Sequence, residues 1–253
     1  MAELYNPELE FITYGRQPVL EALRSGSLVK SAWIASDAQG KIMQQIQALI
    51  QKKKIPLEYL PKNAFQRITG AVVHQGIAAR VQFNPFVAED GLAGYLSSLD
   101  NPLLLLLDQM QDAHNLGAIL RTAEITGVNL IILPSKGSAP INATIAKTSA
   151  GALFKVRLMQ TDHLPEIIRL LQAQNISVIA TMPQAQQYIY EENLKNPVAI
   201  VVGSEDRGVR KNLLELCDRS VAIPQFGKIN SLNASVSAAV VLYEVIRQRN
   251  FKD

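Results

Sequence analysis

From residue 103 onward, short apolar runs alternate with longer segments in which apolar residues recur every three or four positions. The runs predict six strands: LLLLLD (103–108), NLIILP (129–134), LFKVRL (153–158), ISVIAT (176–181), VAIVVG (198–203) and SVAIP (220–224). Apolar residues in succession are typical of strands that are buried on both faces of a parallel sheet. Because helical patterns separate the runs, we expect an α/β fold with a mostly parallel sheet covered by helices.

The N-terminal third shows a shorter alternation of the same kind. Strands are predicted at SAWIAS (31–36), PLEYL (56–60) and GIAARVQF (76–83), and helices at Arg16–Arg24, Lys41–Lys53 and Lys62–Ile68. Pro85 and a change of polarity in NPFVAEDG (84–91) predict a linker. We therefore expect a small α/β domain in residues 1–83, a linker and lead-in in 84–101, and a larger domain in 102–253.

Composition narrows the class of protein. The apolar run 103–107 is far shorter than the ~18 residues that span a bilayer, and the N-terminus MAELYNPELEF lacks a basic start and an apolar core, so we expect a cytoplasmic protein. Cys217 is the only cysteine and is interpreted as a small buried apolar residue. His74, His114 and His163 are scattered without metal-ligand spacing. We expect no metal site.

Positive charge is concentrated in the N-terminal third. Residues 11–85 contain ten Lys and Arg against three Asp and Glu, a net charge of +7, whereas residues 86–253 contain fifteen against sixteen, a net charge of −1. A basic module beside a near-neutral domain indicates a domain that holds a polyanion. For QKKK (51–54) alone, a solvated helix end explains the lysines equally well.

Three loops follow predicted strands at the sheet edge where ligands of such folds bind. They are LDQMQDAHNLGAILR (107–121), VVGSEDRGVR (201–210) and IPQFGKINSLNASVSAAVVLYEV (223–245). None contains a G-x-G-x-x-G or Walker pattern. These loops therefore lack the glycine-rich backbone that binds phosphate groups in nicotinamide and nucleoside triphosphate sites.

The first loop places Arg121 in an otherwise apolar amphipathic segment. A guanidinium there suits a phosphate or carboxylate, but a structural ion pair with Glu124 or Asp108 is the alternative. Asn115 is a plausible helix N-cap. Gly117 costs helix stability of ~1 kcal/mol relative to alanine, which suggests close approach of another group.

The other two loops are also polar. Glu205 lies between two glycines that allow close ligand approach, although an ordinary solvated turn has the same composition. In the third loop, Asn233 and Ser235 are candidate helix caps, and Ser231 and Asn233 can offer hydrogen bonds to a ligand.

Together, NLGAILRTAEITG (115–127), VVGSEDRG (201–208) and IPQFGKINSLNASVSAAVVLYE (223–244) resemble the three motifs of the SpoU family of RNA ribose 2′-O-methyltransferases. The resemblance covers about residues 103–249. YGRQPVLEAL (14–23) and HQGIAARV (74–81) resemble the ribosomal-protein-like substrate-binding domain of the rRNA-modifying branch.

The resemblance implies a C-terminal domain with a deep trefoil knot, an exception to the rule against knotted chains. It implies S-adenosylmethionine as cofactor and a homodimer in which the catalytic domains form the interface and both subunits contribute to each site. Gly203, Ile223 and Leu232 would contact the cofactor through backbone groups, with Ser231 and Asn233 lining the same pocket. The branch most similar to this chain methylates a guanosine of 23S rRNA.

By the same resemblance, Arg121 would be the catalytic arginine, with Asn115 and Glu205 beside it. A guanidinium has a pKa above ~12, so it stays protonated near neutral pH. We therefore expect Arg121 to clamp phosphate and stabilise the developing alkoxide, while Glu205 or water assists removal of the proton. RNA contacts are expected from the N-terminal basic residues Arg16, Lys30, Lys52, Lys53 and Arg67.

The chain departs from the family pattern at three places: Ala113 where a proline is usual, Asp206 where glycine is common, and PQF (Pro224 to Phe226) where Pro-Met is more usual. Three other functions stay open: a tRNA ribose methyltransferase, a resistance-type rRNA methyltransferase, and a non-catalytic RNA-binding relative. The N-terminal domain argues against the first, and retention of Arg121, Glu205 and Asn233 against the third.

Overall fold

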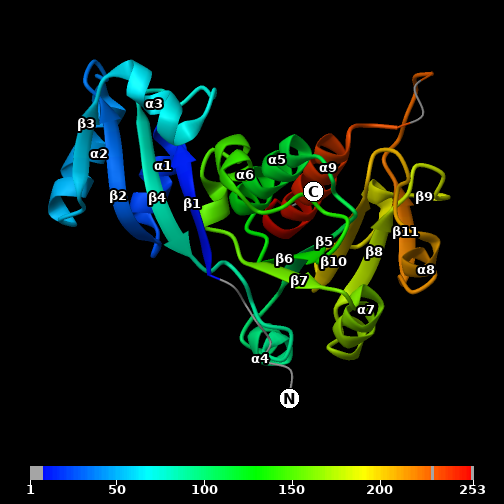
Figure 1. Cartoon of the computed structure of the whole chain (residues 1–253). Helices are drawn as coiled ribbons and strands as arrows, with labels where there is room; N and C mark the ends of the chain where they lie inside the picture. The colour runs from blue at the N-terminus through cyan, green and yellow to red at the C-terminus, as the bar shows by residue number, and fades with distance from the viewer. Residues whose placement is uncertain (1–7, 229–230, 252–253) are drawn as a thin grey trace. The chain divides into compact units, whose positions relative to one another are not determined.

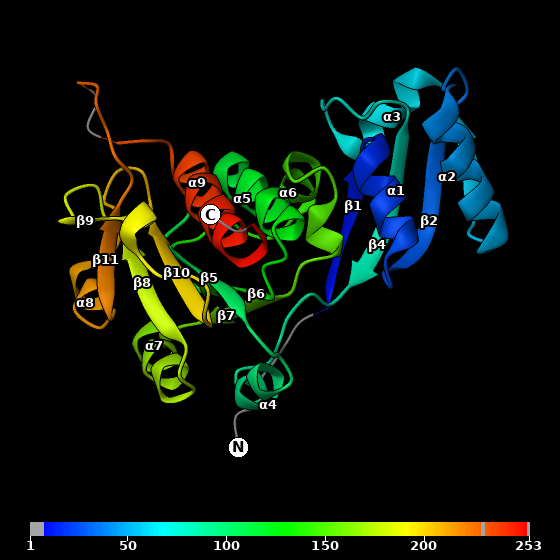
Figure 2. The same cartoon turned by 180° about the vertical axis from the view of Figure 1, so that it is seen from behind.

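The computed structural model of the chain describes residues 8–228 and 231–251, except for the side chains of residues 62 and 63. These residues form two compact units. The first contains the described residues up to Pro85 together with Pro140–Lys155, and the second contains Phe86–Ala139 and the described residues from Val156 onward. Figures 1 and 2 show their elements from two sides.

The first unit is built on a four-stranded mixed sheet. Its strands are β1 (Leu9–Tyr14), β2 (Leu28–Ala35), β3 (Leu57–Leu60) and β4 (Ile77–Phe83), in the order β1-β4-β2-β3. β4 pairs antiparallel with β1 and β2, and β2 pairs parallel with β3. The three predicted strands are confirmed as β2, β3 and β4. β1 was not predicted, because its residues LEFITY are mostly half-buried and lack a clear apolar alternation.

Helices cover this sheet, and they include a segment from much later in the chain. The helices are α1 (Arg16–Arg24), α2 (Lys41–Lys52), α3 (Lys62–Thr69), α6 (Ala143–Thr148) and the 3₁₀ turn η1 (Ala152–Phe154). The first three confirm the predicted helices. α2 buries Met43, Ile46 and Ile50, which share one helix face. The ring of Phe154 packs 4.9 Å from that of Phe83, so η1 is anchored to the first unit.

The strand predicted at LFKVRL (153–158) is wrong. Gly151 has a φ of +89°, and the chain turns there into η1. The strand of this region, β7 (Leu158–Thr161), begins only at the last residue of the predicted run. Phe154 is apolar because it packs with Phe11 and Phe83, and a pattern of hydrophobicity does not reveal against which unit a residue is buried.

The second unit contains a seven-stranded sheet in which every pairing is parallel. The other strands are β5 (Leu103–Asp108), β6 (Leu130–Pro134), β8 (Ser177–Thr181), β9 (Gln187–Tyr188), β10 (Val198–Gly203) and β11 (Arg219–Ala222). The order is β7-β6-β5-β10-β8-β11-β9. The mostly parallel α/β fold is therefore confirmed. β9 was not predicted, since two residues carry no periodic signal.

Helices lie on both faces of this sheet, as the fully buried β5 requires. They are α4 (Leu92–Ser97), α5 (Ala113–Ile125), α7 (Leu164–Ala173), α8 (Lys211–Leu214), α9 (Ala234–Asn250) and the 3₁₀ turn η2 (Ile189–Glu191). Leu104 and Leu106 share one core cluster with the apolar residues of α4 and α7. α5 and α9 pack side by side on the opposite face (Figures 1 and 2).

Because the strands are parallel, the loops after β5, β8, β10 and β11 emerge at one edge of the sheet. Asp108 and Gly203 are paired across β5 and β10 at that edge. Two of the three loops singled out in the sequence thus begin side by side. The deep knot stays a prediction. In the described part of the chain, no helix is long and apolar enough to span a bilayer.

Cys217 is half-buried against the core cluster of the second unit, and its thiol donates to the carbonyl oxygen of Leu213 at 3.2 Å. Burial, aided by the negative charge of Asp218, raises the pKa of the thiol to about 12. Since the thiolate is the reactive form, we expect alkylation of the native protein near neutral pH to be ~10³-fold slower than that of an ordinary cysteine. Mass spectrometry after iodoacetamide treatment measures this rate. Equal rates of alkylation in native and unfolded protein would contradict the burial of the Cys217 thiol.

Candidate functional site

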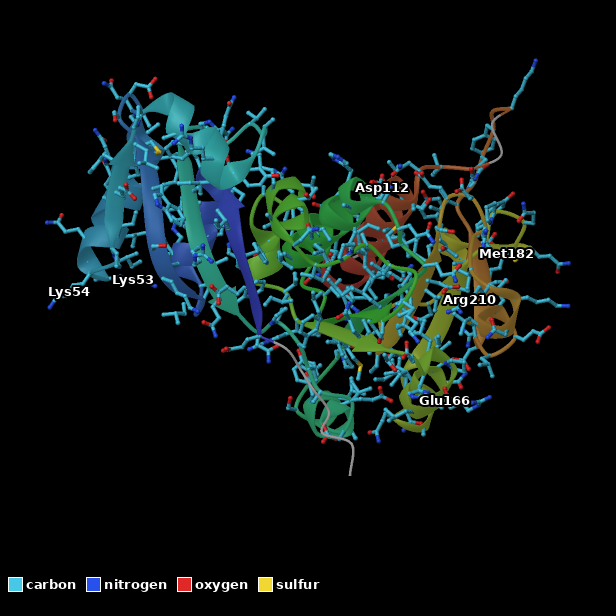
Figure 3. The ribbon with its side chains drawn as sticks, in the orientation of Figure 1. Lys53, Lys54, Asp112, Glu166, Met182 and Arg210 are labelled. Carbon is cyan, nitrogen blue, oxygen red and sulfur yellow. The ribbon has the colours of Figure 1, made fainter. Side chains whose placement is uncertain are left out.

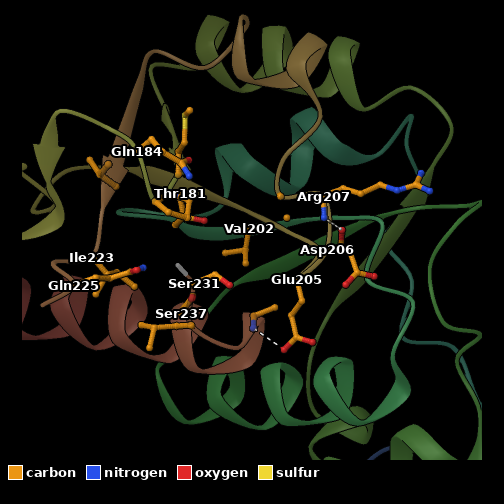
Figure 4. Close-up of a pocket in the computed structure, with 18 residues that line it drawn as sticks. Thr181, Gln184, Val202, Glu205, Asp206, Arg207, Ile223, Gln225, Ser231 and Ser237 are labelled. Atoms are coloured by element: carbon orange, nitrogen blue, oxygen red, sulfur yellow. Dashed lines mark hydrogen bonds between the residues drawn. The ribbon is translucent and has the colours of Figure 1, made fainter. Parts of the chain in front are cut away.

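A cavity of about 310 Å³ lies at the carboxyl edge of β8, β10 and β11, a size typical of the smaller ligand pockets. Its lining comes from separate segments of the chain (Figure 4). These are Thr181–Gln184 at and after the end of β8, Val202–Gly208 at and after the end of β10, Val221, Ile223 and Gln225 along and after β11, and Ser231, Leu232, Ala234 and Ser237 before and at the start of α9.

The loop after β10 is folded tightly back on itself at Gly203. A Cβ atom on this residue would lie 2.0 Å from the carbonyl carbon of Gly208 and 2.2 Å from its oxygen. The amide of Gly208 donates to the carbonyl oxygen of Ser204 at 2.9 Å, and Gly208 has a φ of +65°. Asp206 is not among the residues with positive φ. The strain that Asp206 could have introduced is avoided, because the left-handed position falls on Gly208.

A buried carboxylate anchors the far end of this loop. Asp108 is 1% exposed, and its two oxygens accept from the backbone amide and from Nε of Arg210 at 2.9 Å each. The second guanidinium nitrogen, Nη2, lies 2.8 Å from Oδ1. Asp108 is therefore engaged by Arg210, and the predicted alternative in which it pairs with Arg121 is wrong.

Asn115, Asn233 and Glu205, one from each of the three loops, meet beside the cavity. The amide nitrogen of Asn233 donates to Oδ1 of Asn115 at 2.9 Å and also to Oε1 of Glu205. The backbone amide of Ala234 donates to the same glutamate oxygen at 3.2 Å (Figure 4). These hydrogen bonds supply partners for Asn115, Glu205 and Asn233, which lie far apart in sequence next to apolar strands and helices.

Asn233 is also the N-cap of α9. Its Oδ1 accepts from the amides of Ser235 and Val236 at 2.9 and 3.3 Å. Asn115, by contrast, does not cap α5: that position belongs to Asp112, whose carboxylate accepts from the amide of His114 at 2.9 Å. The N-cap interpretation of Asn115 is wrong, since Asn115 lies inside the helix and is buried.

Arg121 lies exposed on α5 and makes no hydrogen bond or ion pair with any residue that the structure describes. It is six residues beyond Asn115, which corresponds to ~9 Å along the helix axis and a different face. The chain brings Asn115, Glu205 and Asn233 together, and it does not bring Arg121 to the same network. An exposed guanidinium without a partner remains available to an anion that comes from outside this chain.

The predicted cofactor residues fall into two groups. Gly203, Ile223, Ser231 and Leu232 line the cavity, whereas Asn233 lies next to it and holds Glu205. The segment after β8, which includes Met182 (labelled in Figure 3), was missed. Pro183, two residues after the end of an apolar strand, was the available signal for a loop at this edge.

The predicted RNA-contacting residues do not form one cluster. Arg16 lies at the first turn of α1, and Arg67 is exposed on α3. Lys52 and Lys53 are exposed at the end of α2, about 18 Å from the start of that helix, and Lys53 projects from the ribbon in Figure 3. Lys30 pairs with Glu10 at 2.7 Å.

No cluster of His, Cys, Asp and Glu suited to a metal ion occurs among residues 8–228 and 231–251. Within the first unit, the ring of His74 stacks on Phe65 with centroids 4.6 Å apart. Its Nδ1 accepts from the amide of Gly76 at 3.1 Å.

Comparison with known proteins identifies two matching families. Residues 102–243 match the SpoU rRNA Methylase family, and residues 12–87 match the family of RNA 2′-O ribose methyltransferase substrate-binding domains. The chain is 32% identical over 243 residues to the 23S rRNA (guanosine-2′-O-)-methyltransferase RlmB of Escherichia coli (strain K12), with 96% of this chain and 99% of that protein covered.

Solved structures are similar over nearly the whole chain. An RNA 2′-O ribose methyltransferase has a TM-score of 0.78 and 27% identity, covering 95% of this chain and 89% of that one. The SpoU methyltransferase AviRb from Streptomyces viridochromogenes, crystallised with AdoMet, has a TM-score of 0.79 and 21% identity, with 95% and 90% covered. At this identity, the second likeness shows the fold alone.

Proposed function

The chain belongs to the SpoU rRNA methylase family, and from this premise we propose that it transfers a methyl group from S-adenosylmethionine to the ribose 2′-hydroxyl of a guanosine in 23S rRNA. The observation that carries the proposal is the meeting of Asn115, Glu205 and Asn233 beside one cavity. Relatives at 32–41% identity carry the name 23S rRNA guanosine-2′-O-methyltransferase.

The residues that line the cavity suit S-adenosylmethionine. Gly203 leaves no side chain between the cavity and the backbone of its own loop, so amides and carbonyls can recognise a nucleoside directly. Ile223 and Leu232 supply apolar contacts, and Ser231 supplies a hydroxyl. The bound cofactor would supply an electrophilic methyl group on a sulfonium.

Two charged residues are then assigned roles toward the RNA. Glu205 uses Oε1 for Asn233 and Ala234, and its Oε2 has no partner in the described part of the chain, so it is available to accept the proton of a ribose hydroxyl directly or through water. Arg121 would hold the phosphate beside the target ribose and stabilise the alkoxide that develops on the 2′-oxygen. Alignment of that oxygen with the methyl group should supply much of the rate acceleration.

We further propose a homodimer through α5 and α9, with Arg121 of one subunit serving the cavity of the other. Three large apolar side chains on these helices are more than two fifths exposed: Ile125, Val236 and Tyr243. α5 also carries Arg121, which has no partner among the residues of its own chain that the structure describes. In a two-fold dimer, the same patch meets its own copy, so each subunit would give one arginine and receive one.

The functional division of the chain follows the same proposal. Residues 1–83 would bind the RNA substrate, 84–101 would form the linker and lead-in, and 102–253 would carry out catalysis.

Methyl transfer from radiolabelled S-adenosylmethionine tests the proposed function. The purified protein is offered protein-free 23S rRNA, 16S rRNA and bulk tRNA in parallel. Label in 23S rRNA alone supports the proposal. Label in tRNA would favour the tRNA alternative, and binding of S-adenosylmethionine without transfer to any of these RNAs would favour a non-catalytic relative.

The two roles of Asn233 can be separated with Asn233→Ser and Asn233→Ala. Serine retains a side-chain oxygen that caps α9, but it cannot donate to both Asn115 and Glu205, so we expect nearly unchanged stability and a roughly tenfold loss of methyl transfer. Alanine also removes the cap and should cost a further ~1 kcal/mol of stability. Thermal unfolding and initial transfer rates measure the two effects. Full activity of Asn233→Ser would show that the network does not position Glu205.

A further inference from the structure

A second cavity, of about 560 Å³, lies in the first unit and is lined by none of the residues assigned to methyl transfer. Arg16, Ala35, Asp37, Ala38 and the segment Val72–Gly76 line it. Gln75 forms part of this wall and has a φ of +54°, a conformation that is uncommon for a residue with a Cβ atom. A backbone held in this region often marks a functional position.

Gln75 gathers two cations from distant parts of the sequence. Its Oε1 accepts from the backbone amide of Arg16 at 3.0 Å and from Nζ of Lys147 at 3.1 Å, and its carbonyl oxygen accepts from Nε of Arg16 at 3.3 Å. Lys147 belongs to α6, which is part of the first unit although it lies 72 residues beyond Gln75. A single neutral residue thus holds an ammonium through its side chain and a guanidinium through its backbone carbonyl.

Gly15 provides the space that Lys147 occupies. A Cβ atom on Gly15 would lie 2.5 Å from Nζ of Lys147, and Gly15 has a φ of +94°. Gly15 is also the N-cap of α1, where Arg16 begins the helix and no acidic residue occupies the first turn. The lysine is therefore placed against the positive end of a helix, where a cation is electrostatically unfavourable.

The carboxylate of Asp37 lines the same cavity as Arg16, but among the described residues it forms no ion pair with Arg16 or Lys147. Neither Arg16 nor Lys147 forms an ion pair with any residue in the described part of the chain. Burial lowers the pKa of Lys147, because removal from water disfavours its charged form. Lys147 has two further N–H donors, and Gln75 retains its amide nitrogen as a donor. The cluster offers hydrogen-bond donors and positive charge to an anion.

Resting on the proposed function, we propose that Arg16, Gln75 and Lys147 form a phosphodiester-binding subsite for a single-stranded segment of the RNA substrate. The cavity beside Arg16 has room for an unstacked nucleotide, and proteins recognise RNA most specifically where bases are unstacked. The guanidinium fork of Arg16 and the ammonium of Lys147 suit phosphate oxygens. Asp37 on the cavity wall disfavours free inorganic phosphate, whose charge is greater than that of a phosphodiester.

The salt dependence of RNA binding tests this subsite in the full-length protein. The probe is a short fluorescein-labelled oligouridylate, and the variants are Arg16→Gln, Lys147→Gln and the double variant. Each lost phosphate contact should reduce the slope of log K against log salt by about 0.7 and weaken binding about fivefold at 0.1 M salt. Lys147→Arg, which keeps the charge, should restore most of the affinity. Arg24→Gln removes one positive charge at the opposite end of α1 and should leave the slope unchanged.

Two further readouts separate this proposal from the proposed function. The variants should keep their affinity for S-adenosylmethionine and their thermal stability, while KM for rRNA rises. Unchanged slopes and KM values in an enzyme that still methylates rRNA would overturn the subsite alone. Displacement of the oligouridylate by inorganic phosphate at equal ionic strength would also overturn it, because the site would then bind a simple anion rather than an RNA strand.

Discussion

Replacement of Arg121 by alanine should lower the rate of methyl transfer by about 10²–10³-fold while leaving the fold and the binding of S-adenosylmethionine intact. Arg121 is exposed and has no partner in the described part of its own chain, so its loss leaves no buried group unpaired. If it stabilises the developing alkoxide and the neighbouring phosphate, removal of one such group costs about 10²–10³-fold in rate. Single-turnover methyl transfer to 23S rRNA measures the effect directly.

Arg169→Ala is the matched control for Arg121→Ala. Arg169 is an exposed arginine on α7, its nearest carboxylate is that of Glu166 at 4.0 Å, and the proposal gives it no role. The Arg169→Ala variant should retain the wild-type rate of methyl transfer. Arg121→Lys keeps the charge but lacks the planar fork, and we expect only partial activity. A rate for Arg121→Ala within a few fold of wild type would remove Arg121 from the proposed mechanism.

The second large effect is expected for Gly203→Ala. The new Cβ atom would stand 2.0 Å from the carbonyl carbon of Gly208, so the two backbones must separate by about 1.4 Å to reach the 3.4 Å of ordinary contact. The displaced segment, Val202–Gly208, lines the cavity that we propose binds the cofactor. A misplacement of ~1 Å near a reacting centre can cost 10²-fold in rate. We expect a comparable loss of affinity for S-adenosylmethionine, measured by calorimetry.

Gly94→Ala is the corresponding control. A Cβ atom on Gly94 meets nothing within 4 Å, and the residue lies inside the helix α4. Alanine there should raise stability by up to ~1 kcal/mol and leave cofactor binding unchanged. Tight cofactor binding by a correctly folded Gly203→Ala protein would show that the loop after β10 does not hold the cofactor.

Arg121→Ala and Gly203→Ala together test the shared site of the proposed dimer. When Arg121→Ala and Gly203→Ala subunits are unfolded, mixed and refolded, half of the dimers should contain one of each. In such a dimer, the intact loop of one subunit meets the intact arginine of the other, so about a quarter of the wild-type activity should return. No recovery, in a mixture shown by mass spectrometry to exchange subunits, would place Arg121 in the site of its own chain.

Much of the fold could be predicted from the sequence, because the strands of a parallel sheet are buried on both faces and therefore consist of uninterrupted apolar residues. Five of the six predicted strands of the larger sheet are present as β5, β6, β8, β10 and β11. The remaining run contains Phe154, which is apolar because it packs on Phe83 in the first unit. Periodicity reports that a residue is buried, but it does not report what covers it.

The candidate site was predictable as a set of loops, and not as a set of contacts. Asn115 has the residue type of an N-cap, but Asp112 takes that role, and Asn115 bonds to Asn233. The partner of Asp108 is Arg210, 102 residues away. Such pairings depend on strand order, which brings β10 beside β5, and no local pattern in a single sequence encodes this order.

The subsite around Gln75 escaped prediction for the same reason. Arg16 was singled out from its stretch of sequence, but Lys147 lies in the segment Pro140–Lys155, which joins the first unit only in three dimensions. A count of charges along the chain assigns this lysine to the larger, near-neutral part. Only the three-dimensional structure shows that this lysine lies against the N-terminus of α1, beside Gln75.

Alkaline hydrolysis of labelled 23S rRNA tests the central claim most directly. A 2′-O-methyl group blocks attack of the 2′-oxygen on the neighbouring phosphate, so that one linkage survives alkali. We predict that label transferred by the wild-type protein is recovered in a single alkali-resistant dinucleotide whose first nucleoside is guanosine, and that Arg121→Ala yields at most about a hundredth of this label in the same time. Recovery of the label in ordinary mononucleotides would place the methyl group on a base and contradict the account.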